Sequence, residues 1–167
     1  MIEELKNILL TEKKTISVAE SLTGGNLQAL LSSVNGSSKF FIGGITAYNI
    51  DVKDKFFKFN YESAKLCDCV SDDIALSMAK GITEIMESDY GIGTTGFAVP
   101  NESVDVPYAY ICIFNKNTSK YKIIKIKNKS NLVRVDFQKL LSRASIYFLL
   151  ENIGELNWKY NFLKIGT

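Results

Sequence analysis

Hydrophobic positions along the chain follow two spacings, one typical of amphipathic helices and one typical of strands. Residues 2–13 carry apolar side chains at helical spacing, and residues 15–19 alternate in the way that favours a first strand. Leucines at helical spacing then predict a helix over residues 24–33. A strand followed directly by a helix indicates a sharp turn between the two.

The rest of the chain continues this alternation. Further strands are expected at residues 40–48, 90–94, 108–114 and 121–127. Further helices are expected at about residues 52–57, from 71 to 86, and from 132 to about 154. Strands that alternate with helices usually pair in parallel. Turn-forming residues at 115–119 predict a β-hairpin, which adds an antiparallel pair. The order therefore predicts one α/β domain over residues 1–167, a three-layer α/β/α sandwich with a mixed sheet.

Composition narrows the functional classes. The chain has 20 Lys and Arg against 18 Asp and Glu, a balance that argues against nucleic-acid or membrane-surface partners bound by bulk electrostatics. No apolar run reaches membrane-spanning length, and the acidic, helical N-terminus does not resemble a signal peptide. The apolar tail at residues 155–167 is expected to dock on the domain or on a partner subunit.

Histidine and cysteine content limits the chemistry. The chain has no histidine, which excludes Ser-His and Cys-His mechanisms and leaves a zinc site without its usual ligands. The three cysteines have no CxxC spacing and are expected to be free thiols in a reducing cytoplasm. We therefore predict a cytoplasmic protein with no metal and no cofactor.

The turn after the first strand is the strongest candidate for a site. Ser21 and Thr23 stand where a helix start has free N–H groups, and Gly24 and Gly25 let a ligand approach those groups closely. A purely structural alternative is that one hydroxyl caps the helix while the glycines close the turn. Both interpretations remain open on this segment alone.

Five segments together resemble the CinA C-terminal domain family. They are residues 19–25, 36–38, 47–53, 70–71 and 95–100. The likeness covers roughly residues 5–150 and implies the fold expected above. The family includes nicotinamide-nucleotide amidases, which hydrolyse nicotinamide mononucleotide to nicotinate mononucleotide and ammonia. The resemblance also implies a homo-oligomer and a pyridine nucleotide as the small-molecule partner. It further implies a stand-alone form without the additional N-terminal domain of some members.

The resemblance implies catalytic roles for three residues. Ser21 matches the family serine and is the expected nucleophile, and Lys53 matches the family lysine and is the expected base, which requires an uncharged amine. Tyr48 either relays a proton between them or holds one of them in place. Glu20 either orients the lysine or binds the ribose. Without the resemblance, Lys53 would be read as a solvated charge and Tyr48 as a half-buried aromatic residue.

The substrate phosphate needs its own anion site. The turns at residues 23–25 and at residues 94–96 both offer backbone amides. If Ser21 uses the first turn for its oxyanion, the phosphate needs the second. We therefore favour Thr95 and Gly96, with help from Ser37 and Ser38.

The chain departs from the family pattern around the ligand. Val99 replaces a glycine, the loop 101–105 has two carboxylates and no glycine, and residues 106–109 lack the family's lysine and final glycine. Cys67, Asp68 and Cys69 also replace family residues. The pattern fits an amidase with a changed substrate, or a catalytically silent nucleotide-binding or regulatory module. A third interpretation, motivated by the tail, is an oligomeric interaction protein with no ligand.

Overall fold

A five-stranded mixed sheet forms the centre of the protein in the computed structural model, which describes residues 1–153. The strands are β1 (Ile16–Glu20), β2 (Phe41–Thr46), β3 (Tyr90–Gly96), β4 (Tyr108–Asn115) and β5 (Lys120–Lys127). Their order in the sheet is β2-β1-β3-β4-β5. Strand β1 pairs in parallel with β2 and β3, while β4 runs antiparallel to β3 and β5. The mixed sheet predicted from the sequence is thereby confirmed.

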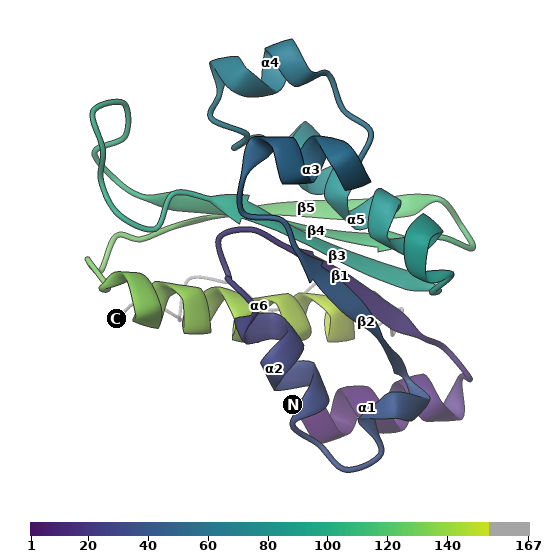
Figure 1. Ribbon diagram of the computed structural model, residues 1–167. Helices are drawn as coiled ribbons and strands as arrows, with labels where there is room; N and C mark the ends of the chain where they lie inside the picture. The colour runs from purple at the N-terminus through teal and green to yellow at the C-terminus, as the bar shows by residue number, and fades with distance from the viewer. Residues whose placement is uncertain (154–167) are drawn as a thin grey trace.

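Helices cover both faces of this sheet (Figure 1). One layer contains α1 (Ile2–Thr11), α2 (Asn26–Ser32) and α6 (Arg134–Ile153), and the other contains α3 (Ile50–Phe56), α4 (Tyr61–Leu66) and α5 (Asp72–Met86). This arrangement confirms the three-layer α/β/α prediction. Helix α4 was not predicted; Asn60 begins it by accepting a hydrogen bond from the Ser63 N–H at 2.9 Å.

Two packing surfaces hold the layers together. Leu27, Leu31 and Phe137 pack with Val18 and other buried residues on the α2 and α6 face. On the opposite face α5 packs closely against β3. Gly91 and Gly93 allow this close approach, since a side-chain carbon at either position would collide with backbone atoms of the helix. The predicted docking of residues 155–167 lies outside the described residues. Within residues 1–153, no helix is both long enough and apolar enough to cross a membrane.

The chain order creates a crevice at one end of the sheet. The connection from β1 to β2 runs through α2 on one face, whereas the connection from β2 to β3 runs through α3, α4 and α5 on the other face. Strand β3 lies on the opposite side of β1 from β2. Open α/β sheets bind ligands at such a switch point, beyond the carboxyl ends of the strands. The ends of β1 and β3 are therefore where a site is expected.

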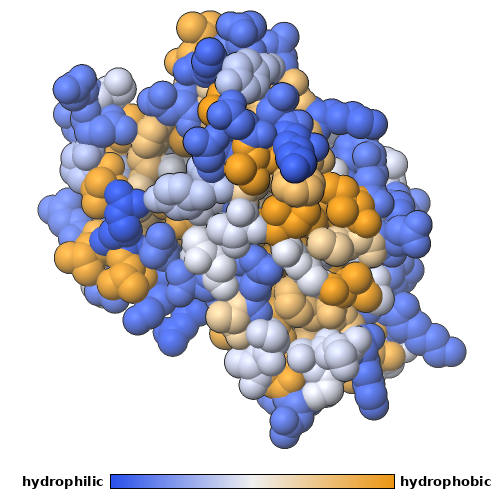
Figure 2. All heavy atoms as spheres, in the orientation of Figure 1, coloured by the Kyte–Doolittle hydropathy of each residue, from blue (hydrophilic) through white to orange (hydrophobic). Residues whose placement is uncertain are grey.

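The surface between β2 and two helices is apolar. Among the large hydrophobic residues with exposed side chains are Ile42 in β2, Val52 and Phe56 in α3, and Ile85 in α5. Figure 2 shows apolar atoms gathered over this part of the molecule, between α3 and β2 as they are labelled in Figure 1.

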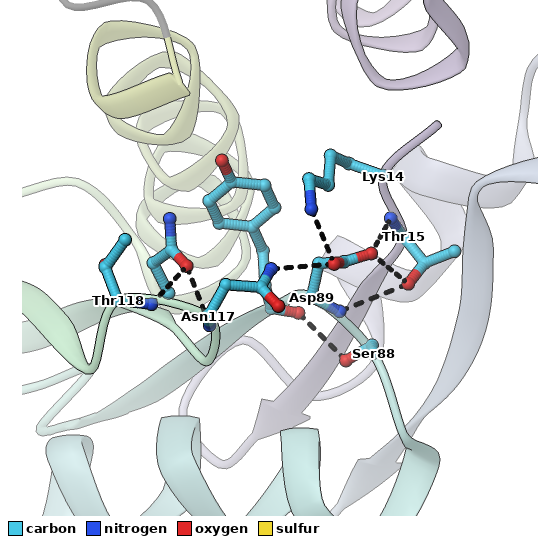
Figure 3. A network of polar contacts seen from close by, with 8 residues as sticks. Lys14, Thr15, Ser88, Asp89, Asn117 and Thr118 are labelled. Carbon is cyan, nitrogen blue, oxygen red and sulfur yellow. Dashed lines mark hydrogen bonds and ion pairs between the residues drawn. The ribbon is translucent and has the colours of Figure 1, made fainter. Parts of the chain in front are cut away.

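A polar network closes the amino end of the sheet (Figure 3). The Asp89 carboxylate accepts hydrogen bonds from Lys14 Nζ at 3.0 Å, the Thr15 N–H at 2.9 Å, the Thr15 hydroxyl at 3.0 Å and Asn117 Nδ2 at 2.7 Å. Burial alone would raise the pKa of Asp89, but the hydrogen bonds from Asn117, Lys14 and Thr15 lower it to about 2. The network joins the start of β1, the start of β3 and the β4–β5 hairpin.

Candidate active site

Ser21 is fixed between two strands at the carboxyl end of the sheet. It follows the last residue of β1, and its N–H donates to the Thr94 carbonyl of β3 at 3.0 Å. Its carbonyl accepts from the Gly24 N–H at 3.1 Å, and Gly24 and Gly25 adopt positive φ angles of 59° and 93°. Glycine takes this conformation without strain, which lets the chain turn sharply into α2.

Glu20 stabilises this turn from inside. The side chain is fully buried, and its carboxylate accepts hydrogen bonds from the N–H groups of Gly25 at 2.9 Å, Leu27 at 3.1 Å and Gln28 at 2.8 Å. A carboxylate at a helix N-terminus satisfies free amides and complements the helix dipole. Glu20 does not line the cavity described below. The expectation that it orients Lys53 or binds ribose is corrected, because its oxygens are engaged by α2.

The same contacts change the expected anion sites. The amides of Gly25, Leu27 and Gln28 are taken by Glu20 and are not available to a ligand. Within residues 1–153, the N–H groups of Leu22 and Thr23 have no hydrogen-bond acceptor. Amides next to a nucleophile are well placed to stabilise a developing oxyanion. Of these two residues only Leu22 lines the cavity described below, so an oxyanion site at this turn would use the Leu22 N–H rather than the helix start.

Lys53 is a buried amine. Helix α3 begins at Ile50 after the Asn49 cap, whose side chain accepts from the Asp51 N–H at 2.7 Å, and this places Lys53 on the inner side of the helix with 4% of its surface exposed. In the described part of the chain, its Nζ has no hydrogen bond and no ion pair. Burial lowers the pKa of the Lys53 amine, against a smaller opposite effect of the Cys69 thiol.

Tyr48 lies at the mouth of the site. Its side chain is 60% exposed, and its hydroxyl accepts a hydrogen bond from Arg134 Nη1 at 3.2 Å. Arg134 is the first residue of α6, so this contact joins the segment after β2 to the layer on the other face of the sheet. The hydroxyl is directed to Arg134 and is not bonded to Ser21 or Lys53. The arrangement favours a positioning role for Tyr48 over a proton relay.

The end of β3 forms the floor of the site. Thr95 and Gly96 line the cavity. The Thr95 hydroxyl donates to the Cys69 carbonyl at 2.6 Å, and Thr23 shares a hydrogen bond with the Thr94 hydroxyl at 2.7 Å. Thr23, Gly24 and Gly25 do not line the cavity and support the turn from behind.

Ser37 and Ser38 lie at the wrong end of the sheet for this site. They form a 3₁₀ turn (Ser37–Lys39) that leads into β2, and the first residue of β2 pairs with the first residue of β1. In two parallel strands, the residues just before one strand and the residues just after the other lie at opposite ends of the sheet. The predicted ligand contacts of Ser37 and Ser38 are therefore wrong for this cavity.

A cavity of about 330 Å³ brings the predicted catalytic residues together. Ser21, Tyr48 and Lys53 all line it. The lining residues that were not expected as site residues include Asp68, Phe97, Asn101 and Arg134. Asp68 adopts a positive φ of 50°, which is uncommon for a residue other than glycine. Phe97 follows β3 and packs edge-on to Tyr108, with ring centroids 5.6 Å apart.

The altered loop after β3 meets the cavity at only some of its residues. Val99 and Asn101 line the cavity, whereas Glu102 and Asp105 do not. Asn101 and Val104 exchange backbone hydrogen bonds of 3.0 and 3.2 Å, which turns the loop back on itself. The Val99 side chain therefore takes up space at the cavity, whereas the Glu102 and Asp105 carboxylates lie outside its lining.

The arrangement can support acyl transfer. The Ser21 hydroxyl, the buried Lys53 amine with its lowered pKa, and Leu22, whose N–H has no acceptor within residues 1–153, all lie at one cavity. Arg134 adds a fixed positive charge suited to a phosphate or carboxylate.

Comparison with known proteins agrees with this architecture. Residues 1–153 match the CinA C-terminal domain. A CinA-like protein of Picosynechococcus sp. is 43% identical over 108 residues, which are 64% of this chain and 26% of that protein. A CinA-like protein of Dictyoglomus turgidum is 37% identical over 136 residues, which are 80% of this chain and 33% of that protein. The chain thus spans about a third or less of the length of these relatives.

Solved structures share the fold. A competence-damaged protein (CinA) superfamily protein from Klebsiella pneumoniae superposes with a TM-score of 0.85 at 18% identity, covering 93% of this chain and 96% of that one. A competence/damage inducible protein from Agrobacterium tumefaciens gives a TM-score of 0.78 at 24% identity, covering 89% and 93%. With the match over residues 1–153, we conclude that this chain belongs to the CinA C-terminal domain family.

Proposed function

We propose that this chain is an amidohydrolase that converts nicotinamide mononucleotide to nicotinate mononucleotide and ammonia through an acyl-enzyme on Ser21. The observation that carries the proposal is the Lys53 amine, which is buried, lacks a partner within residues 1–153 and lines the same cavity as Ser21. Strongly desolvated titratable groups in a cavity are enriched at functional sites.

The first half-reaction forms the acyl-enzyme. Lys53, as a neutral amine, takes the proton of the Ser21 hydroxyl, and Oγ attacks the carboxamide carbon. The N–H group of Leu22, which lines the cavity, stabilises the resulting oxyanion. The Lys53 ammonium then gives its proton to the leaving nitrogen, so that ammonia departs and the amine is neutral again.

The second half-reaction uses the same base. Lys53 takes a proton from water, and the hydroxide attacks the ester carbon. Collapse of this intermediate breaks the bond to Ser21 Oγ, which recovers its proton from Lys53. The product acid then loses its proton to solvent and leaves as a carboxylate.

Substrate recognition rests on charge and size. Cavities of a few hundred Å³ suit small ligands, and this one is about 330 Å³. Arg134 is suited to the substrate phosphate, and it lines the same cavity as Thr95 and Gly96. The pyridinium charge of the bound substrate would lower the Lys53 pKa further, which favours the neutral base.

A direct assay tests the proposal. Purified full-length chain is mixed with a small panel of pyridine nucleotides, and ammonia release and nucleotide binding are measured in parallel. We expect ammonia release from nicotinamide mononucleotide. Binding of the nucleotide without any ammonia release would reject the amidase.

A catalytically silent nucleotide-binding module is the second candidate. It is favoured by the Val99 side chain, which lines the cavity where the family pattern has a glycine. This candidate predicts a nucleotide-dependent rise in the unfolding temperature with no turnover, so the two readouts of the same assay separate the candidates.

A further inference from the structure

Three successive carbonyl groups in the turn after β1 are held by different parts of the molecule. The Ser21 and Thr23 carbonyls accept hydrogen bonds of 3.1 and 3.0 Å from the backbone N–H groups three residues further along the chain. The Leu22 carbonyl between them accepts instead from Gln138 Nε2 of α6, at 2.9 Å. Within residues 1–153, this carbonyl has no other hydrogen-bond donor. The Leu22–Thr23 peptide is therefore fixed from outside the turn, by one side chain.

Helix α6 holds the Gln138 side chain firmly beside the turn. Phe137 is 1% exposed and Leu141 is fully buried, and both pack in the core under α2 and α6. Gln138 Nε2 also lies close to Gly24, since a side-chain carbon at Gly24 would be 3.5 Å from it. A well-packed helix therefore supplies the donor, which is how site geometry is kept within narrow limits.

The same end of α6 contacts the segment that carries the base (Figure 1). Arg134, four residues before Gln138, donates to the Tyr48 hydroxyl at 3.2 Å, and the chain continues from there into α3 and Lys53. Residues four apart lie on the same side of a helix. The first turns of α6 thus bond to both segments, the one that follows Ser21 and the one that precedes Lys53.

We propose that Gln138 is a positioning residue for amide hydrolysis, acting through the Leu22 backbone. A peptide group is planar, so a bond to the Leu22 carbonyl also fixes the orientation of the backbone on either side of it. Leu22 lines the cavity and its N–H is the expected oxyanion donor. Such donors stabilise the transition state only when they are already oriented towards it. The inference rests on the proposed amidase, since it assigns Gln138 a role in that reaction.

A positioning role has a kinetic signature that a purely structural contact lacks. The oxyanion forms in the transition state and is absent from the bound substrate, so loss of its donor geometry lowers kcat and leaves KM nearly unchanged. A contact that only stabilises the fold would lower the unfolding temperature, while kcat per folded molecule stayed the same.

The test is ammonia release by the full chain over a range of nicotinamide mononucleotide concentrations. Gln138→Met keeps the length of the side chain without its donor, and we expect kcat to fall by about ten- to a hundredfold at nearly constant KM. Gln138→Glu is a second variant of similar shape that also lacks the donor, and the same loss is expected. Gln28→Met is the matched control, because the Gln28 side chain also donates a 2.9 Å bond, to the Thr46 hydroxyl, and both constants should be kept.

Hydrogen–deuterium exchange measured by mass spectrometry is the second readout, and it does not depend on turnover. Peptides covering residues 21–25 should exchange faster in Gln138→Met than in Gln28→Met, and circular dichroism melting checks that each variant is folded. If the wild type releases no ammonia, the amidase is rejected, and faster exchange in Gln138→Met would still support the hold of Gln138 on the turn. Equal exchange in the two variants would overturn the inference. So would a folded Gln138→Met protein with the kcat and KM of the control.

Discussion

At the amino end of β1 and β3 the Asp89 carboxylate is surrounded by four donor groups, whereas at the carboxyl end the Lys53 amine has no partner within residues 1–153. The Lys53 amine is buried, whereas the Asp89 side chain is 22% exposed. The pKa of Asp89 is lowered to about 2 because its charged form is hydrogen-bonded, and the pKa of Lys53 is lowered because its charged form is desolvated.

The two ends of the sheet therefore differ in what they contribute: one contributes to stability and the other, under the proposed function, to catalysis. Paired charge at the amino end favours the folded state, because the bonds that hold Asp89 exist only after folding. A buried amine without a partner in the described part of the chain costs folding free energy, and under the proposed function its neutral form serves as the base. Variants at the two ends should therefore have opposite effects on activity and on stability.

The largest expected effect is at Ser21. Ser21→Ala removes the nucleophile and should lower ammonia release by about a thousandfold or more. The unfolding temperature should stay near that of the wild type, since the contacts of Ser21 are made by its backbone. Nucleotide binding by calorimetry is the control, and a Ser21→Ala protein that still turns over at the wild-type rate would exclude the acyl-enzyme.

Lys53→Met should separate activity from stability. It removes the base and should lower ammonia release by about a hundredfold or more. Because methionine fills a similar volume without a buried amine, the free energy of unfolding should be unchanged or higher. The matched control is Lys14→Met at the other end of β1, where the lost bond to Asp89 should lower stability while turnover per folded molecule is kept.

Asp89→Asn tests the amino end of the sheet. The amide cannot accept all four donors, so the free energy of unfolding should fall by about 2 kcal/mol, with activity per folded molecule unchanged.

The pKa of Asp89 in the folded protein is about 2, and its ordinary value is 3.8. The wild-type stabilisation is therefore complete above the ordinary value and is lost as pH falls towards 2, and urea unfolding across this range should show a shallower pH dependence in the variant. Equal slopes would contradict the role of Asp89.

A smaller effect is expected at Arg134. Arg134→Gln removes the fixed charge at the cavity and the hydrogen bond to Tyr48, and should raise KM for the nucleotide about tenfold with a lesser effect on kcat. Tyr48→Phe removes only the hydroxyl and separates the two contributions. If KM is unchanged in Arg134→Gln, the phosphate binds elsewhere, and the backbone at Thr95 and Gly96 is then the next site to test.

Local signals in the sequence predicted where the helices and strands lie better than they predicted which side chains make contact. The strand, glycine turn and helix around Ser21 follow from side-chain spacing and turn residues, and the structure places them as expected. The role of Glu20 could not be read in this way, because nothing local tells where a buried carboxylate points. Arg134 lay in a stretch rich in cations, with no local signal that set it apart.

The error at Ser37 and Ser38 had a different origin. They were assigned to the ligand through the family resemblance, although the segment that contains them precedes β2. The order of the elements was already sufficient to exclude them, because a turn before β2 lies at the opposite end of the sheet from a turn after β1.

In the proposed mechanism Lys53 acts as an uncharged base for Ser21. The most direct measurement is ammonia release from nicotinamide mononucleotide as a function of pH for the wild type and for Lys53→Arg, which keeps a cation that does not lose its proton in this range. We expect wild-type activity to rise with pH through the lowered pKa of Lys53, and the arginine variant to be inactive at every pH. An arginine variant with the wild-type rate and pH profile would contradict this mechanism.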